Sequence, residues 1–196
     1  ELRPTGGFIG SFGLVSFENG RLLDFQVHDV YTADGQLKGH VEPPPALKRY
    51  LGEAAWYLRD VNWDPDFPTT ARQAEWFLEK EMGRQVDGTI GINLFTIQNL
   101  LSALGGITLP DYQENITKDN LFERAEYYSE VNFFPGSTQK KDFLAALARA
   151  VYDRLSSLNP QETLLVLNAI QDSLVNRQLL VSLLDESQLM SQLNWD

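Results

Sequence analysis

The sequence contains no cysteine and only two histidines, His28 and His40. The lack of cysteine excludes disulfide bonds, thiolate metal sites and a cysteine nucleophile. Two histidines are too few for a histidine-rich metal centre, and because neither lies in a motif we expect surface or structural roles for both. No apolar run approaches the roughly 18–20 residues that cross a bilayer, and no signal peptide is visible.

Positive charge is also scarce. Lysine and arginine together number 16 against 27 acidic residues, which gives a net charge of -11 and a pI near 4.6. Phosphate-backbone binding requires a basic face, so we expect no nucleic-acid partner. A chain of 196 residues, 43% hydrophobic, can bury a core and predicts a single domain over residues 1–196. Its abrupt ends, Glu1 and Asp196, indicate a piece of a longer protein.

Hydrophobic patterning predicts an α/β fold. Residues 8–17 and 22–30 alternate around Asn19-Gly20, as in a β-hairpin. A strand, a helix and a second strand follow one another between residues 86 and 109 with short joints, which favours a layered α/β sheet. The other expected helices cover residues 46–51, 69–82, 118–128, 138–155, 161–173 and 186–193, and a further strand covers 178–184.

Residues 58–70 concentrate polar chemistry in a turn-rich connection before a helix. They contain Arg59, three carboxylates (Asp60, Asp64 and Asp66) and Trp63. Charged loops between regular elements often carry binding or catalytic residues, because the scaffold holds them in place. The alternative is a hydrogen-bonded turn and helix cap without chemistry.

Three segments of the sequence resemble a known family. They look like the bacterial "domain of unknown function 4012" family. The first is Arg-Pro-Thr-Gly-Gly-Phe-Ile-Gly-Ser at residues 3–11. The second, within residues 58–68, is Leu-Arg-Asp followed by Trp-Asp-Pro-Asp-Phe-Pro, and the third is Val-Asp-Gly at 86–88. The likeness runs along nearly the whole chain. It implies an extracytoplasmic domain that is membrane-anchored in the full-length protein.

The order of elements is more distantly similar to the LytR-CpsA-Psr family. Its members transfer cell-wall glycopolymers from a polyprenyl-pyrophosphate carrier, using Mg²⁺. The stretch from Asp87 to Leu109 resembles that family's strand–helix–Gly-Gly–strand unit, and residues 58–60 resemble its Pro-Arg-Asp segment. The resemblance implies a sandwich with a mixed, largely antiparallel central sheet flanked by helices.

The chain departs from that family at two places. Residues 127–130 read Tyr-Tyr-Ser-Glu where the family has a pyrophosphate-binding Arg-x-Arg, although Lys140 and Lys141 stand nearby in sequence. Pro4 and Thr5 replace the metal-binding aspartate region of the family's first strand. These departures weaken the case for catalysis and favour a non-catalytic binding module or a protein-interaction domain, whereas the cluster of Arg59 to Asp66 favours an enzyme.

Pyrophosphate transfer needs cations, usually arginine forks with Mg²⁺ held by carboxylates. The resemblance therefore assigns catalysis to Arg59 and Asp60, phosphate binding to Arg3, Thr5, Lys140 and Lys141, and Mg²⁺ to Asp64 and Asp66. The alternatives are a buried ion pair of Arg59 with a neighbouring carboxylate, and capping and turn formation by Asp64 and Asp66. Five aromatic residues could line an apolar cavity for a lipid tail: Trp56, Tyr57, Trp63, Trp76 and Phe77.

The expected function is that of a cell-envelope domain that acts on or binds polyprenyl-phosphate-linked glycan. If the domain is an enzyme, the expected reaction is a phosphotransfer that attaches glycopolymer to the cell wall. The expected partner is thus a lipid-linked glycan or a cell-wall polymer. The alternatives are a non-catalytic binding module and a protein-interaction domain of a cell-surface protein.

Overall fold

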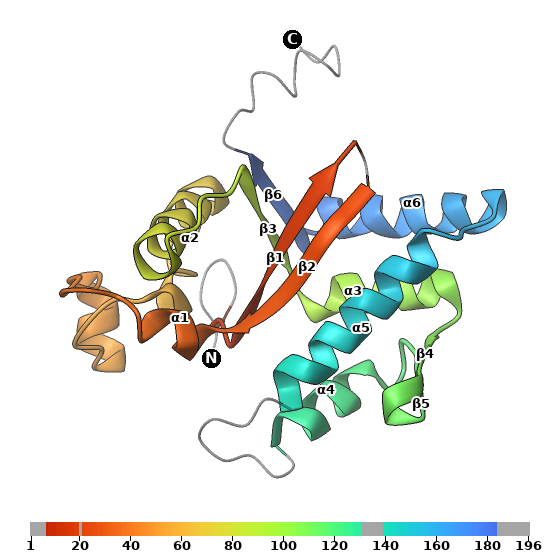
Figure 1. Cartoon of the computed structure of the whole chain (residues 1–196), viewed down its shortest axis with the longest axis horizontal. Helices are drawn as coiled ribbons and strands as arrows, with labels where there is room; N and C mark the ends of the chain where they lie inside the picture. Colours follow the sequence, from red (N-terminus) through yellow and green to blue (C-terminus); the bar gives the residue numbers. More distant parts are fainter. Residues whose placement is uncertain (1–6, 20, 131–138, 184–196) are drawn as a thin grey trace. The chain divides into compact units, whose positions relative to one another are not determined.

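The computed structural model describes residues 7–19, 21–130 and 139–183 (Figure 1). The chain forms two compact units, each assembled from separate stretches of sequence. Unit 1 comprises Glu1–Phe12, His28–Ile90 and Val181–Asp196, and unit 2 comprises Gly13–Val27 and Gly91–Leu180. That the two units make up one domain stays a prediction.

Unit 1 is organised on the helix α2 (Phe67–Met82). The helix begins where the Asp66 carboxylate accepts a hydrogen bond from the Thr69 amide, with Pro68 in the first turn, and ends at Gly83 in the left-handed conformation (φ 65°). Its start lies two residues before the predicted one. Three short helical segments accompany it: α1 (Val30–Asp34), η1 (Leu47–Leu51) and η2 (Leu58–Asp60).

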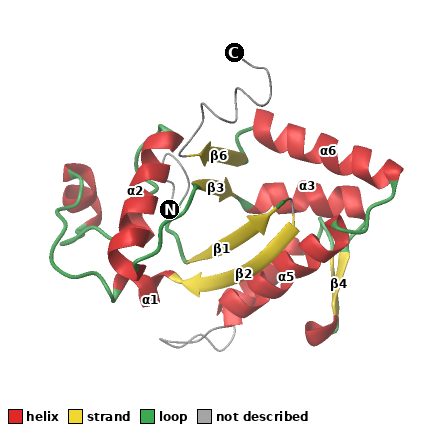
Figure 2. Cartoon of the chain, turned by 45° about the horizontal axis from the view of Figure 1, so that its top comes forward, coloured by secondary structure: helices red, strands yellow, loops and turns green. Residues whose placement is uncertain are grey.

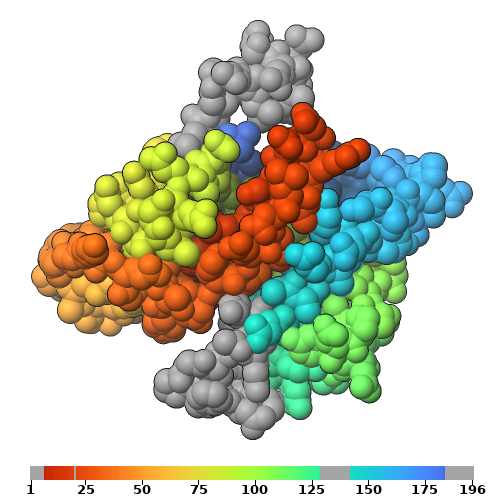
Figure 3. Space-filling model, viewed as in Figure 1, coloured from red at the N-terminus to blue at the C-terminus, as the bar shows by residue number. Residues whose placement is uncertain are grey.

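The core of unit 1 forms where α2 meets α1 and η2. Its buried members are Val30, Ala33, Leu58, Val61 and Phe77. Other side chains of α2 reach the surface of the unit (Figure 3), and Trp76 is 43% exposed. The helix therefore joins a packed interior to an accessible face.

Unit 2 contains most of the hairpin β1 (Ser11–Glu18) and β2 (Arg21–Asp29), which the sequence predicted. Its helices are α3 (Leu94–Leu104), α4 (Leu121–Glu130), α5 (Gln139–Leu155) and α6 (Pro160–Val175). Asn93 caps α3, and Asn159 forms a reciprocal capping box with Glu162 at the start of α6. The buried core consists of Leu100, Leu101, Ile107, Leu109, Ile116, Leu121, Ala125, Phe143, Leu147, Val151, Val166 and Ala169.

The strands pair two by two over the described ranges (Figure 2). β1 pairs with β2, and β3 (Gly88–Ile92) pairs with β6 (Leu179–Leu183). β4 (Ile107–Leu109) and β5 (Glu114–Ile116) are antiparallel, with Ile107 opposite Ile116. The α/β class is therefore confirmed, whereas these residues form three small sheets rather than one central sheet.

Four short elements of the described chain were not predicted, namely α1, η2, η3 (Pro110–Tyr112) and β5, and one prediction falls outside the described chain. Asp29 accepts a hydrogen bond from the Tyr31 amide and starts α1 in a stretch whose polarity indicates a turn. The three-residue strand β5 is too short to show alternation. The expected helix at 186–193 lies outside the described residues. No described helix combines the length and apolarity needed to span a membrane.

Candidate functional site

Arg59 lies at the centre of an ionic cluster in unit 1. Its Nη1 donates to Asp34 Oδ2 at 2.8 Å, its Nε lies 3.3 Å from Asp60 Oδ2, and its Nη2 lies 3.5 Å from Glu53 Oε2. The Asp34 and Asp60 side chains are only 4% and 1% exposed, and the Arg59 side chain is 19% exposed. We call these four residues the Arg59 cluster.

Aromatic rings and the backbone complete the surroundings of Arg59. The guanidinium carbon lies 4.3 Å from the Tyr57 ring centroid and 5.8 Å from that of Tyr31, within the range of cation–π attraction. The Arg59 carbonyl accepts a hydrogen bond from the Ile9 amide at 3.0 Å. Arg59 is thus held both through its side chain and through its backbone.

A further buried carboxylate, Glu81 of α2, adds negative charge near the cluster. Its Oε1 accepts a long hydrogen bond of 3.4 Å from the Leu58 amide, and its Oε2 has no hydrogen-bond partner. Burial, followed by the charge of Asp34, raises the pKa of Glu81 to about 7. Burial also raises the pKa of Asp34, against the opposing effect of Arg59.

The balance of charge defines what the Arg59 cluster can do. Burial lowers the pKa of Arg59, but the hydrogen bond and charge of Asp34, with the charges of Asp60 and Glu53, keep it above its ordinary value. One guanidinium thus faces three carboxylates at ion-pair distance. A phosphate would have to displace these carboxylates and would meet their repulsion, so the cluster suits a structural ion-pair network better than anion binding.

Asp64 and Asp66, the predicted metal ligands, shape the turn before α2. Asp64 Oδ1 accepts from the Asp66 amide at 2.9 Å, and Asp66 Oδ2 accepts from the amide and hydroxyl of Thr69 at 3.0 and 2.6 Å. The hydrogen bonds to Thr69 lower the pKa of Asp66. These contacts match the alternative of a turn and helix cap.

The described residues do not assemble the oxygen-rich ligand set that Mg²⁺ prefers. Among them, no three histidine, aspartate or glutamate side chains come together as a metal-binding group. Asp64 and Asp66 also each use one carboxylate oxygen in the local hydrogen bonds above. A role for Mg²⁺ stays a prediction.

The other predicted phosphate ligands cannot be placed beside Arg59. Arg3 and Thr5 lie outside the described residues. Lys140 and Lys141 belong to the first turn of α5 in unit 2, and their side chains are not described. Of the predicted site residues, the structure therefore brings together Arg59 and Asp60 in one cluster and Asp64 and Asp66 in one turn.

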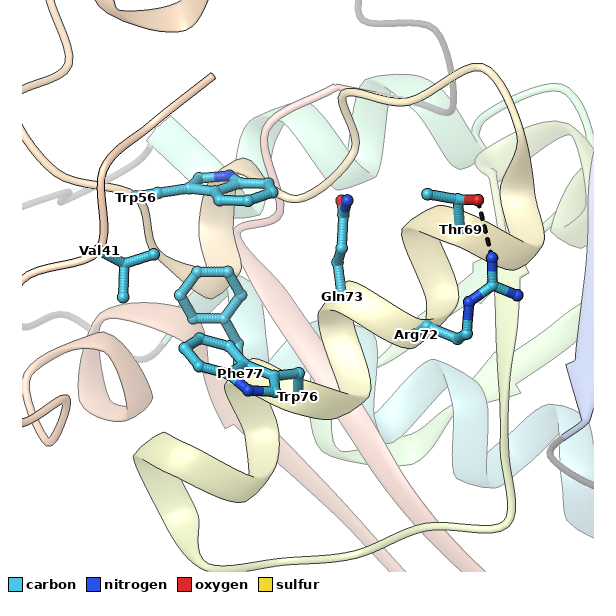
Figure 4. Close-up of a pocket in the computed structure, with 7 residues that line it drawn as sticks. All are labelled: Val41, Trp56, Thr69, Arg72, Gln73, Trp76 and Phe77. Carbon is cyan, nitrogen blue, oxygen red and sulfur yellow. Dashed lines mark hydrogen bonds between the residues drawn. The ribbon is translucent and has the colours of Figure 1, made fainter. Parts of the chain in front are cut away.

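A pocket of about 410 Å³ lies on α2 in unit 1 (Figure 4). Seven residues line it and define what we call the aromatic pocket: Val41, Trp56, Thr69, Arg72, Gln73, Trp76 and Phe77. Three of the five aromatic residues expected to line a cavity are among them. Tyr57 packs on Arg59 instead, and Trp63 is not among the lining residues.

The aromatic side chains of the pocket are positioned by one another. The Phe77 ring meets Trp56 and Trp76 edge to face, with centroids 5.4 and 5.0 Å apart. Trp56 Nε1 donates to the Asp60 carbonyl at 3.2 Å, and the Trp56 amide donates to the Val41 carbonyl at 2.8 Å. The apolar wall is therefore held before any ligand arrives.

Sequence reasoning missed the partners of Arg59 and the polar residues of the pocket. Asp34 and Glu53 are 25 and six residues from Arg59 in the chain, and no local motif links them. Glu81 could have been found, since it follows Phe77 by four residues and so shares the buried face of α2. Arg72 and Gln73 could likewise be placed on the face of Thr69 and Trp76 by helical spacing.

Comparison with known proteins identifies a family and nothing narrower. No curated protein and no solved structure matches this chain. One family model, described as "Protein of unknown function (DUF4012)", matches residues 1–128, which include the turn at residues 58–70, α2 and every residue of the Arg59 cluster and the aromatic pocket. The chain therefore belongs to the DUF4012 family.

Proposed function

We propose that this chain is an extracytoplasmic domain of a membrane-anchored cell-envelope protein that binds polyprenyl-phosphate-linked glycan without transferring it. The observation that carries the proposal is the aromatic pocket, in which the rings of Trp56, Trp76 and Phe77 share one cavity. Ligand pockets are typically apolar with a few polar groups that fix orientation, and about 410 Å³ falls within their range.

Both parts of a lipid-linked glycan suit such a wall. Indole and phenyl rings pack against isoprenoid carbon as readily as against the C–H faces of a sugar ring. Trp76 is 43% exposed, so a ligand can reach the pocket from solvent. The resemblance of residues 58–60 and 87–109 to the LytR-CpsA-Psr family supports this ligand class and a related sandwich fold.

Binding is preferred over phosphotransfer because of the Arg59 cluster. Transfer through Arg59 would require its guanidinium to face the phosphates, but Asp34, Asp60 and Glu53 lie at ion-pair distance from its three nitrogens. Residues 127–130 also lack the arginine pair of the transferase family. The cluster therefore argues against transfer through Arg59, and the aromatic pocket remains the observation that supports binding.

The test is a titration with a short-chain polyprenyl-pyrophosphate-linked disaccharide, followed by tryptophan fluorescence and by melting temperature. A ligand that binds only the folded state raises the melting temperature by mass action. We expect Trp76→Ala to weaken binding by about tenfold or more, because a large aromatic contact is lost. Tyr50→Ala, which removes a 74% exposed aromatic residue outside the pocket, is the matched control and should bind normally.

Two results would contradict the proposal. The first is no response to the lipid-linked disaccharide at millimolar concentration by the folded wild-type protein. The second is equal binding by the wild-type protein and the folded Trp76→Ala variant. Release of polyprenyl phosphate in a transfer assay with an added acceptor glycan would instead support the enzymatic form.

A further inference from the structure

Three polar side chains border the aromatic pocket, all from the first half of α2: Thr69, Arg72 and Gln73 (Figure 4). Arg72 Nη2 donates to Thr69 Oγ1 at 2.9 Å, and the Thr69 hydroxyl donates to Asp66 Oδ2 at 2.6 Å. This chain of hydrogen bonds orients the Arg72 guanidinium and uses only one of its nitrogens, Nη2. The remaining N–H groups of Arg72 are available to a ligand.

Arg72 differs from Arg59 in its charged neighbours. Over the described ranges, no carboxylate lies within ion-pair distance of Arg72, whereas Arg59 has three. Asp66 is close enough for Arg72 to contribute to its lowered pKa, although the hydrogen bonds from Thr69 are the larger cause. In a chain of net charge -11, such a guanidinium beside a cavity is a natural contact for an anionic ligand.

Gln73 supplies an unused acceptor in the same place. Its Oε1 is buried and has no hydrogen-bond partner. A buried carbonyl oxygen without a donor costs free energy, which a ligand hydroxyl would recover after a rotation of the Gln73 side chain turns Oε1 into the pocket that this residue lines. Figure 4 shows the Gln73 amide on the side of α2 that faces Trp56, so a ring lying on the aromatic wall lies near it.

Cavity size limits the occupant. The volume of about 410 Å³ lies towards the lower end of the roughly 300–1,000 Å³ typical of small-molecule pockets. It suits one or two sugar rings better than a long isoprenoid chain. A ligand that satisfies every group of the pocket has a C–H face, a hydroxyl group and an anionic substituent.

We infer that the aromatic pocket is a subsite for an acidic sugar, a pyranose that bears a carboxylate or phosphate group. The ring packs on Trp56 and Trp76, a hydroxyl group donates to Gln73 Oε1, and the anionic group pairs with Arg72. This inference rests on the proposed function and names the sugar class of its ligand. Arg72 is the residue that determines specificity.

The test uses three probes that differ only at C6 of one hexose: glucose, glucuronate and glucose 6-phosphate. We expect the preferred anionic sugar to bind at least about tenfold tighter than glucose in calorimetric titrations at low salt, because an arginine–anion pair is screened at high salt. Comparing glucuronate with glucose 6-phosphate identifies whether a carboxylate or a phosphate is the preferred substituent.

Arg72→Gln tests the assignment of the cation. We expect it to remove the preference for anionic sugars, so that the folded variant binds glucose, glucuronate and glucose 6-phosphate with similar affinity. Arg84→Gln, which removes an exposed arginine outside the pocket, is the matched control and should keep the preference. Gln73→Leu should weaken the binding of all three sugars, because it removes the acceptor for a hydroxyl group that they share.

The outcomes separate this inference from the proposed function. Equal affinity for the three probes, or a preference that survives Arg72→Gln, overturns the acidic-sugar assignment. Binding of the lipid-linked disaccharide would then persist, and the proposed function would stand. If neither the probes nor the lipid-linked disaccharide bind, both conclusions fail.

Discussion

Arg59 of η2 and Asp34 of α1 form a hydrogen-bonded ion pair of 2.8 Å in which the carboxylate side chain is 4% exposed. The pair adds an ionic contact between two short elements that also share the buried core of unit 1. Burial raises the pKa of Asp34 in spite of the arginine, so the charged form of the pair depends on Arg59. The stability of unit 1 should therefore depend on the Arg59 side chain.

Arg59→Met is expected to destabilise the protein by about 3–5 kcal/mol at pH 7, because it leaves buried carboxylates without their cation. The measurement is the free energy of unfolding in urea. Arg84→Met removes an exposed arginine of the same unit and should change stability by less than about 0.5 kcal/mol. Equal urea midpoints of unfolding for the two variants would show that the Arg59 cluster does not stabilise the fold.

Glu81 should make stability depend on pH in the neutral range. Its pKa is raised from 4.5 to about 7, so the folded state binds the proton more tightly than the unfolded chain. This contribution is fully present below pH 4.5 and decreases as the pH rises towards 7. The change in pKa corresponds to on the order of 3 kcal/mol.

The Glu81→Gln variant isolates this effect, because glutamine keeps the shape and stays neutral. Its stability relative to wild type should increase between pH 4.5 and about 7 and stay constant above that range. Urea unfolding at several pH values measures the difference. A stability difference that does not vary with pH would mean that Glu81 titrates as an exposed glutamate does.

Gly88 lies where β3 meets β6 with no room for a side chain. A Cβ atom there would lie 2.5 Å from the Ser182 carbonyl oxygen and 2.7 Å from Leu183 Cδ2. We expect Gly88→Ala to cost about 1–3 kcal/mol, since the backbone carbonyl cannot rotate away. Thermal unfolding measures this loss of stability. Ser16→Ala, at an exposed position of β1, is the control. An unchanged melting temperature for Gly88→Ala would contradict the close pairing.

The start of α6 offers a test confined to unit 2. Asn159 Oδ1 accepts from the Gln161 and Glu162 amides, both at 2.9 Å. Asn159→Ala should cost about 0.5–2 kcal/mol through loss of the cap. Asn168→Ala changes the same residue type at an exposed position inside the helix, and alanine's helix propensity should leave stability unchanged or slightly higher. Equal losses in both variants would exclude the capping explanation.

Local signals predicted most of the regular elements. The Asn19-Gly20 turn, the glycines after α2 and α3, the cap Asn93 and the helix-opening Pro160 mark ends that the structure confirms within a few residues. These signals act over one helical turn or one hairpin. They are therefore visible without knowledge of tertiary contacts.

The site was predicted only in part, for a physical reason. The sequence allowed two roles for Arg59, and the choice between them depends on Asp34, which reaches it only through the fold. Asp64 and Asp66 look alike in a metal site and in a turn, because both uses need a carboxylate oxygen in a loop. Aromatic content predicted a lined cavity, but not that Tyr57 would instead pack on the guanidinium.

The chain passes from one unit to the other four times, after Phe12, Val27, Ile90 and Leu180. Neither unit can therefore be cut out as one continuous polypeptide. A fragment that ended at residue 128, where the family match ends, would lack α5, α6 and β6, the strand that pairs with β3. It would also lack five core residues of unit 2: Phe143, Leu147, Val151, Val166 and Ala169. Expression boundaries for this chain should accordingly follow the packing and extend at least through Leu183.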